Sequence, residues 1–562
     1  MILCCSLLSY AEASALTNVF SEKGRHVPIT FIVRLDGADG QQVRSDPEPQ
    51  SSDPREAVKL NNSALELAAQ GQYGESELLY NRALAILEKS RGPSDPDVAT
   101  VLNGLGALYA KQGKYTEAEP FYRRALAIDE KALGPDNPNV VIIAGGLAWA
   151  LQNLNRIGEA ESIYKRCLAI EEKAPGPDQQ LHLAKDLNNL ASIYDQQHSY
   201  AEAEPLYHRA LAIDEKTLGS GDPRVATVLR NLGEHYSQQS KYGEAESLYR
   251  RALAIDEKAL GPDDPGVGGD AEGLAFVLQN LGKFAEAEAL FKRASPIYEK
   301  KFGPEDITVA RNLENLGELY VAEAKYSEAE PFYKRALAID EKVLGPAHQD
   351  VGRDLNNLAE DYVEQDEDTK AEPLYRRSLE IAEKELGMDS PELTKTLSNL
   401  AFIYERREKY REAEPLCKRA LAIDEKAYGP DNPDVARDLA NLGDVYASQK
   451  KYAEAELLYK RAQLIGQTAK ESGALWITQS QLGLANVYRD QGKLGIAEPL
   501  YREVISAREQ NHDSDLRMLI EPLDEYAIFL RKTSRTAEAA TVEERAKALR
   551  AKLGTERSNK ER

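Results

Sequence analysis

The chain has 562 residues, of which 42% are hydrophobic and 29% are charged, with 71 Lys and Arg against 93 Asp and Glu. The net charge of -22 repels a phosphate backbone, so we expect no nucleic-acid partner. No apolar run reaches the roughly 18 residues of a membrane span, so we expect no transmembrane segment.

The first residues carry an incomplete leader-like pattern. Residues 1–15 combine a short apolar stretch with Ala-Ser-Ala, which can end a signal peptide, but they lack its basic start. A mispredicted start codon or a disordered tail are the alternatives, and we expect a cytoplasmic protein unless residues 1–15 direct export. Residues 16–54 hold one Ile-Thr-Phe-Ile-Val strand candidate and a polar linker, so we expect no stable domain in residues 1–54.

From residue 55 onwards the sequence repeats itself. Every step is 42 residues except one of 43, and the extra residue falls in a loop after Pro177. A twelfth, blurred copy occupies residues 511–553, so we expect a repeat array over 55–553 and a charged tail over 554–562. The last residue of the recurrent Gly-Gln-Tyr-like turn is found at Tyr73, Tyr115, Ile157, Tyr200, Tyr242, Phe284, Tyr326, Asp368, Tyr410, Tyr452 and Leu494.

Residues 93–134 show what one unit contains. Asp and Pro start a first helix, because both are favourable in a first turn. Gly113 ends it, and a second helix is expected from about Thr116 to Leu133. One hairpin cannot bury its outer face, so stability must come from stacking on neighbours. Spacings of four, three and four residues place four apolar side chains on one face of the first helix: Val98, Leu102, Leu105 and Tyr109.

This unit resembles a tetratricopeptide repeat. It is longer than the common form of about 34 residues, and its Gly-Pro-Asp-Asn-Pro loops at 134–138 and 429–433 resemble the kinesin light chain subclass, as does segment 413–421. The resemblance implies an all-α, right-handed superhelical solenoid of about twelve antiparallel helix-turn-helix repeats that binds proteins in a concave groove. Residues 1–54 supply no heptad-repeat coiled coil, so we expect a stand-alone array. Six residues carry the match: Leu105, Gly106, Tyr109, Ala118, Tyr122 and Ala125.

The resemblance also implies a ligand-binding position. First helices of tetratricopeptide repeats line the groove, and an Asn five residues before the helix Tyr commonly bonds the ligand backbone. Asn is a mediocre helix former that both donates and accepts, so its recurrence favours a use outside the helix. The alternative is that repeat duplication copied it. Six repeats carry Asn here: Asn189, Asn231, Asn315, Asn357, Asn399 and Asn441. Others carry Asn62, Gly104, Gly146, Gly273 and Gly483.

A cation stands four residues before five of these asparagines. Positions i and i+4 share a helical face, so Lys or Arg would run beside Asn down the groove. This stripe predicts an extended ligand with Asp, Glu or a terminal carboxylate. Alternatively, Glu318, Glu360 and Asp444 pair with the cations across repeats, which would contribute only ~0–1 kcal/mol each. The cations are Lys185, Arg311, Arg353, Lys395 and Arg437.

Three repeats carry an aromatic residue at the position equivalent to Glu318. These are Trp149, Phe276 and Phe402. Such side chains either anchor a ligand side chain in a pocket or pack against a neighbouring helix. Both interpretations are open from the sequence.

Patterns for catalysis and metal binding are absent from the sequence. There is no Gly-Lys-Ser/Thr phosphate loop, no His-Glu-x-x-His and no Cys-x-x-Cys. The seven histidines lack ligand spacing, and the Asp-rich loops fit helix caps better than calcium sites. Cys167 and Cys417 are too far apart for a disulfide and are expected as buried hydrophobes. We predict no enzyme, cofactor or metal, and either an interaction scaffold or a structural, self-assembling solenoid without a groove ligand.

Residues 266–273 should be the weakest part of the array, because four glycines crowd one first helix there. Each costs about 0.5–1 kcal/mol relative to Ala in a helix interior, so local opening should be easier. Amide hydrogen exchange should be faster in this segment than in the equivalent helices around Asn231 and Asn315. Slower exchange would contradict the prediction.

Overall fold

The computed structural model describes residues 53–173, 176–468, 474–510 and 516–560. Within these ranges the chain forms 24 α-helices, a short 3-10 turn and no strand, so the predicted all-α class is confirmed. None of these helices combines the length and apolar character needed to cross a bilayer. The chain divides into two compact units, Met1–Leu281 and Gly282–Arg562. Residues 1–52, with the leader-like pattern and the strand candidate, lie outside the described residues.

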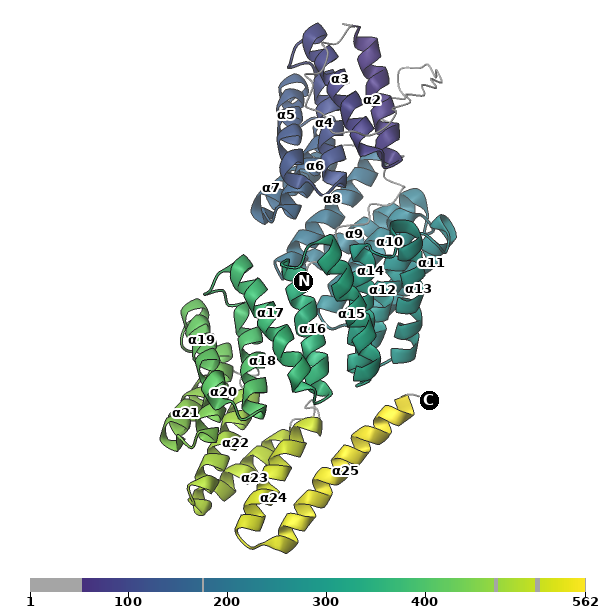
Figure 1. The fold of residues 1–562 in the computed structure, drawn as a ribbon. Helices are drawn as coiled ribbons and strands as arrows, with labels where there is room; N and C mark the ends of the chain where they lie inside the picture. Colours follow the sequence, from purple (N-terminus) through teal and green to yellow (C-terminus); the bar gives the residue numbers. More distant parts are fainter. Residues whose placement is uncertain (1–52, 174–175, 469–473, 511–515, 561–562) are drawn as a thin grey trace. The chain divides into compact units, whose positions relative to one another are not determined.

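The first unit contains helices α2 to α12, in which even numbers mark first helices and odd numbers mark second helices of the repeats (Figure 1). Each first helix packs against the second helix that follows it, and each hairpin packs against the next. The bounds are α2 (Pro54–Ala69), α3 (Tyr73–Arg91), α4 (Pro96–Lys111), α5 (Tyr115–Leu133), α6 (Pro138–Asn153), α7 (Ile157–Glu171), α8 (Pro177–Gln196), α9 (Tyr200–Leu218), α10 (Pro223–Gln238), α11 (Tyr242–Leu260) and α12 (Pro265–Asn280).

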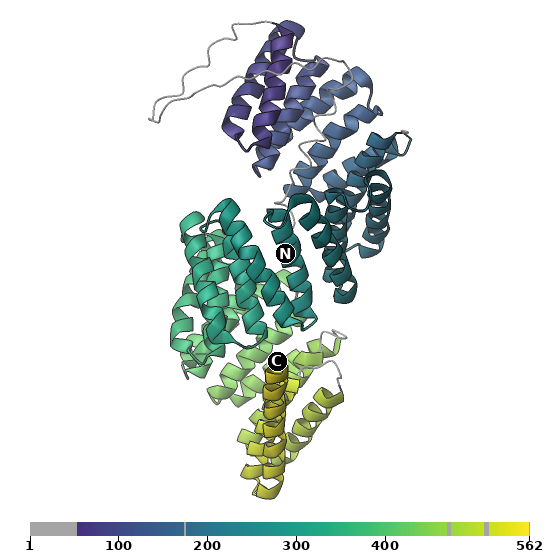
Figure 2. The ribbon, with the colours of Figure 1, turned by 90° about the vertical axis from the view of Figure 1, so that its right-hand side faces the viewer.

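The second unit begins with α13 and continues with six hairpins, whose consecutive helices lie side by side in both views (Figure 2). The last helix passes residue 553, where we expected the array to end. The bounds are α13 (Phe284–Phe302), α14 (Ile307–Ala322), α15 (Tyr326–Val343), α16 (Gln349–Glu364), α17 (Asp368–Leu386), α18 (Leu393–Arg406), α19 (Tyr410–Tyr428), α20 (Pro433–Ser448), α21 (Tyr452–Thr468), α22 (Ala474–Asp490), α23 (Leu494–Gln510), the 3-10 turn η3 (Leu516–Leu519), α24 (Ile520–Lys532) and α25 (Thr536–Lys560).

Most first helices begin at a side-chain cap. Asp95 accepts a hydrogen bond from the backbone N–H of Asp97 at 2.9 Å, and Asn432 accepts one from Asp434 at 2.8 Å. Such caps satisfy N–H groups that have no partner inside the helix. The Asp- and Asn-rich loops therefore have the capping role expected from the sequence.

The turn inside each hairpin contains one residue with positive φ. Gly113, at φ +72°, takes this left-handed conformation without steric cost, just after α4 ends at Lys111. Lys450 occupies the equivalent turn at φ +61°. The helix end predicted at Gly113 is confirmed, and the turn also tolerates other residues.

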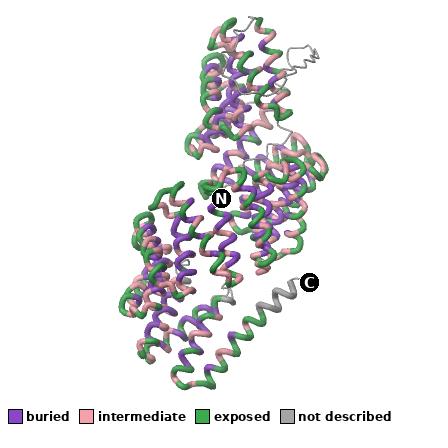
Figure 3. The backbone as a smooth tube through the Cα atoms, in the orientation of Figure 1, coloured by how far each residue is buried: buried purple, intermediate pink, exposed green. Residues whose placement is uncertain are grey.

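Several second helices place a tyrosine between two first helices, whereas α13 carries Phe291 and α19 carries Cys417 at the equivalent position. Tyr459 of α21 is buried between Gly443 of its own repeat and Gly483 of the next. A Cβ on Gly443 would lie 2.7 Å from Tyr459 Cε1, and one on Gly483 would lie 2.4 Å from Cζ. The glycines thus make room for the ring, and the buried band follows the helix interfaces (Figure 3). Two further examples are Tyr122 between Gly106 and Gly146, and Tyr249 between Gly233 and Gly273.

Polar side chains link successive second helices on the side away from this clamp. Arg209 Nη1 lies 2.7 Å from Glu172 Oε1 of the preceding repeat. The same pairing recurs within each unit as Arg124–Glu88, Arg251–Glu215, Arg335–Glu299, Arg377–Glu341, Arg419–Glu383 and Arg461–Glu425. These pairs are partly exposed, so each contributes only ~0–1 kcal/mol and mainly fixes the register between repeats.

First helices of successive repeats approach one another more closely than second helices do. In the first unit, every pair of successive first helices is in contact, beginning with α2 and α4 and ending with α10 and α12. No pair of successive second helices in the described residues comes equally close. A stack with this difference curves towards its first helices. In the first unit, and from α18 onwards in the second, the first helices therefore line the inner side of the stack, and they carry predicted binding residues.

Gly483→Ala should destabilise the second unit, because the new methyl group would collide with the Tyr459 ring. Overpacking of this kind costs about 1–3 kcal/mol. Gly495→Ala in α23 is the matched control, since nothing lies within 4 Å of a Cβ there, and Ala should stabilise the helix slightly. Thermal unfolding followed by circular dichroism should separate the two variants. Equal melting temperatures would contradict the clamp.

Candidate functional site

The predicted Asn position lies at the junction between consecutive repeats. Where it is Gly, the tyrosine of the preceding second helix covers it: a Cβ on Gly104 would lie 2.6 Å from Tyr80 Cε1. Where it is Asn, the side chain can meet the same ring, as Asn189 Nδ2 donates to Tyr164 Oη at 3.2 Å. All six asparagines are half-buried. The position therefore borders the core on one side and solvent on the other.

The asparagines differ in the hydrogen bonds that they make. Asn231 Nδ2 donates to Asn188 Oδ1 at 3.0 Å, and Asn399 Nδ2 donates to Glu360 Oε1 at 3.1 Å, both on the preceding first helix. These bonds favour a packing role in their repeats. Within the described residues, three other asparagine side chains make no hydrogen bond: Asn315, Asn357 and Asn441.

The two lysines of the predicted stripe are accessible. Lys185 of α8 is exposed and forms no ion pair within the part of the chain that the structure describes. Lys395 of α18 keeps 71% of its side chain exposed, and its Nζ lies 2.9 Å from Glu360 Oε1. Glu360 is thus the counter-ion expected from the sequence, whereas Asp444 instead accepts a hydrogen bond from Tyr459 Oη at 2.6 Å.

Two of the three arginines contact buried carboxylates, namely Arg353 and Arg437. Arg311 is half-buried in α14. Arg353 of α16 places Nη2 3.2 Å from Oε1 of Glu314, a buried residue of α14, and Nη1 2.9 Å from Asp350. The counter-ion of Arg353 is therefore Glu314, four residues before the expected Glu318.

Arg437 neutralises a buried pair of carboxylates. Its Nη2 lies 3.0 Å from Asp424 Oδ2 of α19, and its Nε lies 3.1 Å from Asp438 Oδ1 of its own helix. Both acids are buried. Burial raises the pKa of Asp438 to about 7, although the neighbouring guanidinium favours its charged form. Arg437 is therefore part of the junction between α19 and α20.

The three aromatic residues have different surroundings. Trp149 is half-buried and meets Tyr115 edge to face, with ring centroids 5.3 Å apart. Phe276 is 47% exposed and Phe402 is 51% exposed. The guanidinium of Arg406 lies 5.8 Å from the Phe402 ring centroid. Packing against a neighbour therefore describes Trp149, and the anchor role stays a prediction for the two phenylalanines.

One buried histidine lies beside a carboxylate. His235 Nδ1 is 2.6 Å from Asp195 Oδ1, and Tyr207 Oη donates to the other oxygen of Asp195 at 2.9 Å. The His235 side chain is fully buried, so a substrate cannot reach it. This network satisfies buried polar groups between repeats. The free thiols are equally enclosed: Cys167 and Cys417 are buried as predicted, and burial raises the pKa of Cys417 to about 12.

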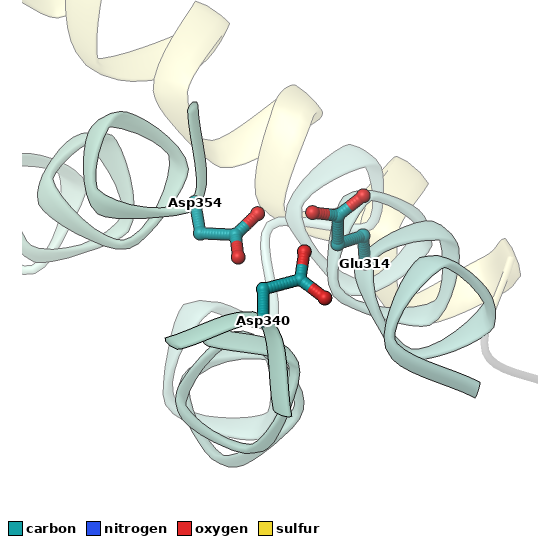
Figure 4. A group of neighbouring side chains, drawn as sticks. All are labelled: Glu314, Asp340 and Asp354. Atoms are coloured by element: carbon teal, nitrogen blue, oxygen red, sulfur yellow. The ribbon is translucent and has the colours of Figure 1, made fainter. Parts of the chain in front are cut away.

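Three carboxylates that the sequence patterns do not single out meet in the second unit. Glu314, Asp340 and Asp354 are buried, and one oxygen of each lies within 4.8 Å of the others (Figure 4). They come from three helices, so no local motif joins them. The one available sequence signal is that the positions two repeats earlier hold Arg230, Asp256 and Asp270.

Family models for the tetratricopeptide repeat match residues 55–131, 97–173, 184–258, 270–342, 325–384 and 392–463, and a second such model matches 478–515. These matches span more than half of the sequence, and the chain belongs to the tetratricopeptide repeat family. Arrays of this family generally act as scaffolds for protein–protein interaction and not as enzymes.

Solved structures with the same repeat architecture are similar at low identity. RapI in its apo form has a TM-score of 0.51 and 17% identity, covering 66% of this chain and 98% of its own. BtubC (BKLC) from P. vanneervenii has a TM-score of 0.37 and 23% identity, covering 41% and 92%. Kinesin light chain nearly identical TPR-like repeats from Podosopora anserina have a TM-score of 0.34 and 24% identity, covering 36% and 97%. No curated protein matches the chain. The similarity to RapI is one of fold.

Arg437→Ala should lower stability far more than Lys395→Ala. Breaking a buried ion pair costs about 3–5 kcal/mol, whereas the exposed Lys395 should contribute at most ~1 kcal/mol. Loss of the Arg437 guanidinium would raise the pKa of Asp424 and Asp438 in the folded state. Their pKa in the unfolded chain would not change. The folded variant would bind extra protons as pH falls, so its deficit should shrink between about pH 8 and about pH 5. Urea unfolding at both pH values measures this, and equal losses in the two variants would contradict it.

Proposed function

We propose that the array binds an extended, acidic protein segment along its first helices, with α18 at the centre of the contact. The observation that carries this proposal is a stripe on α18. Lys395, Asn399 and Phe402 follow one another at spacings of four and three residues, which places them on one face of the helix. Lys395 and Phe402 are more than half exposed. One helix thus presents a cation and an aromatic surface, with the Asn399 amide, which donates to Glu360, between them.

The neighbouring first helices extend this surface. Asn357 of α16 and Asn441 of α20 occupy the position of Asn399, are half-buried, and make no side-chain hydrogen bond within the described residues. An amide with free donor and acceptor groups can bond the backbone of an extended segment. Asn315 of α14 offers the same groups one repeat further away. Main-chain bonds from these amides would hold a segment independently of its sequence, and pockets would select its side chains.

The acidic character of the ligand rests on the accessible lysines. The exposed pair of Lys395 with Glu360 contributes only ~0–1 kcal/mol, so a ligand carboxylate can share or replace Glu360. Lys185 offers a second exposed cation in the first unit. Arg437 is assigned to the junction instead, because its guanidinium neutralises buried acids. Three cations of the predicted five-cation stripe are therefore accessible: Lys185, Lys395 and Arg353, whose side chain is 54% exposed.

The alternative function is a structural or self-assembling solenoid whose first helices take no ligand. The hydrogen bonds of Asn189 and Asn231 inside the array favour such a role for their repeats. Under either function we propose a cytoplasmic protein, unless residues 1–15 direct export. We include no nucleic acid among the partners, given the net charge of -22.

Lys395→Glu should weaken binding of acidic peptides, and Lys426→Glu should not. The two lysines are matched, since each side chain is 71% exposed and each forms one ion pair, but Lys426 lies on second helix α19. A charge-assisted bond is worth about 1.5–3 kcal/mol, so Lys395→Glu should weaken binding by about tenfold or more. Fluorescence anisotropy with Asp- and Glu-rich peptides, and with their Asn and Gln counterparts, measures this.

Circular dichroism should show unchanged folding for both variants. If Lys395→Glu and Lys426→Glu weakened peptide binding equally, the effect would come from overall charge, and the α18 site would be contradicted. Absence of peptide binding, together with concentration-dependent self-association in light scattering, would favour the structural alternative.

A further inference from the structure

The carboxylates of Glu314, Asp340 and Asp354 form an acidic junction between two repeats of the second unit. Glu314 lies on α14, Asp340 on the second helix α15 of the same repeat, and Asp354 on α16 of the next. Asp354 is 1% exposed, and neither of its carboxylate oxygens has a hydrogen-bond partner. Its side chain points towards those of Asp340 and Glu314 (Figure 4). An unpaired buried carboxylate is costly unless it is paired, coordinates a metal or takes a proton.

The first unit contains the same junction with a cation built in. Arg230, Asp256 and Asp270 occupy the equivalent positions two repeats earlier. Arg230 Nη2 lies 2.9 Å from Asp256 Oδ2, and its Nε contacts Asp270 Oδ1. The guanidinium bridges the two buried acids. In the acidic junction, Glu314 therefore takes the place of Arg230, so a negative charge replaces a positive one.

Arg353 compensates for this replacement only in part. Its Nη2 contacts Glu314 at 3.2 Å, and its Nη1 is shared with Asp350 at 2.9 Å. Within the described residues, neither Asp340 nor Asp354 forms an ion pair. With all three carboxylates ionised, the acidic junction and Arg353 together would carry two uncompensated negative charges.

We propose that Glu314, Asp340 and Asp354 bind a hard divalent cation of the Mg²⁺, Mn²⁺ and Ca²⁺ class. The donor set is oxygen only, which is the set that these ions prefer. Oxygens within 4.8 Å of one another fit around a single ion, because ligands on opposite sides of an ion at about 2.1–2.4 Å are about that far apart. The ion would join three helices of two consecutive repeats, in the place that the Arg230 guanidinium takes in the first unit. This role is separate from the proposed ligand binding on α18.

Protonation is the competing way to neutralise the acidic junction. Burial raises the pKa of Asp354 to about 10 and that of Asp340 to about 6. A junction in the first unit has only two carboxyls, because Gly145, Glu171 and Asp186 occupy the positions of Glu314, Asp340 and Asp354. Burial raises the pKa of Glu171 there to about 9. The two carboxyls of that junction can share one proton. The acidic junction has a third carboxylate, which adds a negative charge and a possible ligand for a cation.

The test is titration of the full-length, chelator-treated chain with MgCl2, MnCl2 and CaCl2, using isothermal calorimetry and thermal unfolding. We expect one saturable site for at least one ion, and a melting temperature that rises with its concentration. Glu314→Arg puts a guanidinium at the position of Arg230 and removes one ligand, so it should abolish binding. Asp354→Asn should weaken binding by about tenfold or more, as loss of one charged ligand does.

Glu328→Gln removes an exposed carboxylate of α15 and controls for the general negative charge of the chain. It should bind the ion as the wild type does. No saturable binding up to about 1 mM, the weak end for protein Ca²⁺ sites, would overturn the proposal. Binding that survives Glu314→Arg would also overturn it, because the ion would then sit elsewhere. Glu314→Arg keeps the test decisive if Asp354→Asn fails to fold.

Discussion

The contact on which the rest of the structure depends is the tyrosine of a second helix held between the first helices of two consecutive repeats. Tyr459 fills the space that Gly443 and Gly483 leave open, and its ring belongs to both repeats. A repeat without its neighbour would expose this ring, so the clamp makes stacking obligatory. It lies where first helices of consecutive repeats approach each other, as α20 and α22 do around Tyr459.

Junctions between repeats also bury charge, and two of them neutralise it in different ways. Arg230 bridges Asp256 and Asp270 from the preceding first helix, whereas Arg437 reaches Asp424 and Asp438 from the helix that carries Asp438. These interactions add little net stability relative to apolar packing, because desolvation offsets the attraction. Losing one partner is nevertheless costly. Substitutions at junction arginines therefore act on the array itself, and they differ in kind from substitutions on its inner surface.

Binding capacity is unevenly distributed along the array. In several repeats the Asn position is occupied by glycine under a tyrosine ring, or its amide bonds a neighbouring side chain, as in Asn189, Asn231 and Asn399. The region around α18 differs, because Lys395 and Phe402 are largely exposed there and Asn357 and Asn441 flank them with unpaired amides. Repeats that pack in a similar way can thus differ in the side chains that they expose, so that only a few helices offer a binding surface.

Helix periodicity, the 42-residue repeat, the caps and the turn at Gly113 could all be predicted from the sequence, because each depends on residues close together in the chain. The candidate binding positions could be placed on first helices for the same reason. The sequence could not predict which of the cations are exposed to a ligand. Lys395 and Arg437 occupy equivalent sequence positions, yet one is exposed and the other binds buried acids supplied by a different helix. The meeting of Glu314, Asp340 and Asp354 likewise depends on how three helices are rotated and spaced against one another. That packing depends on contacts between helices far apart in the sequence, which only the tertiary structure shows.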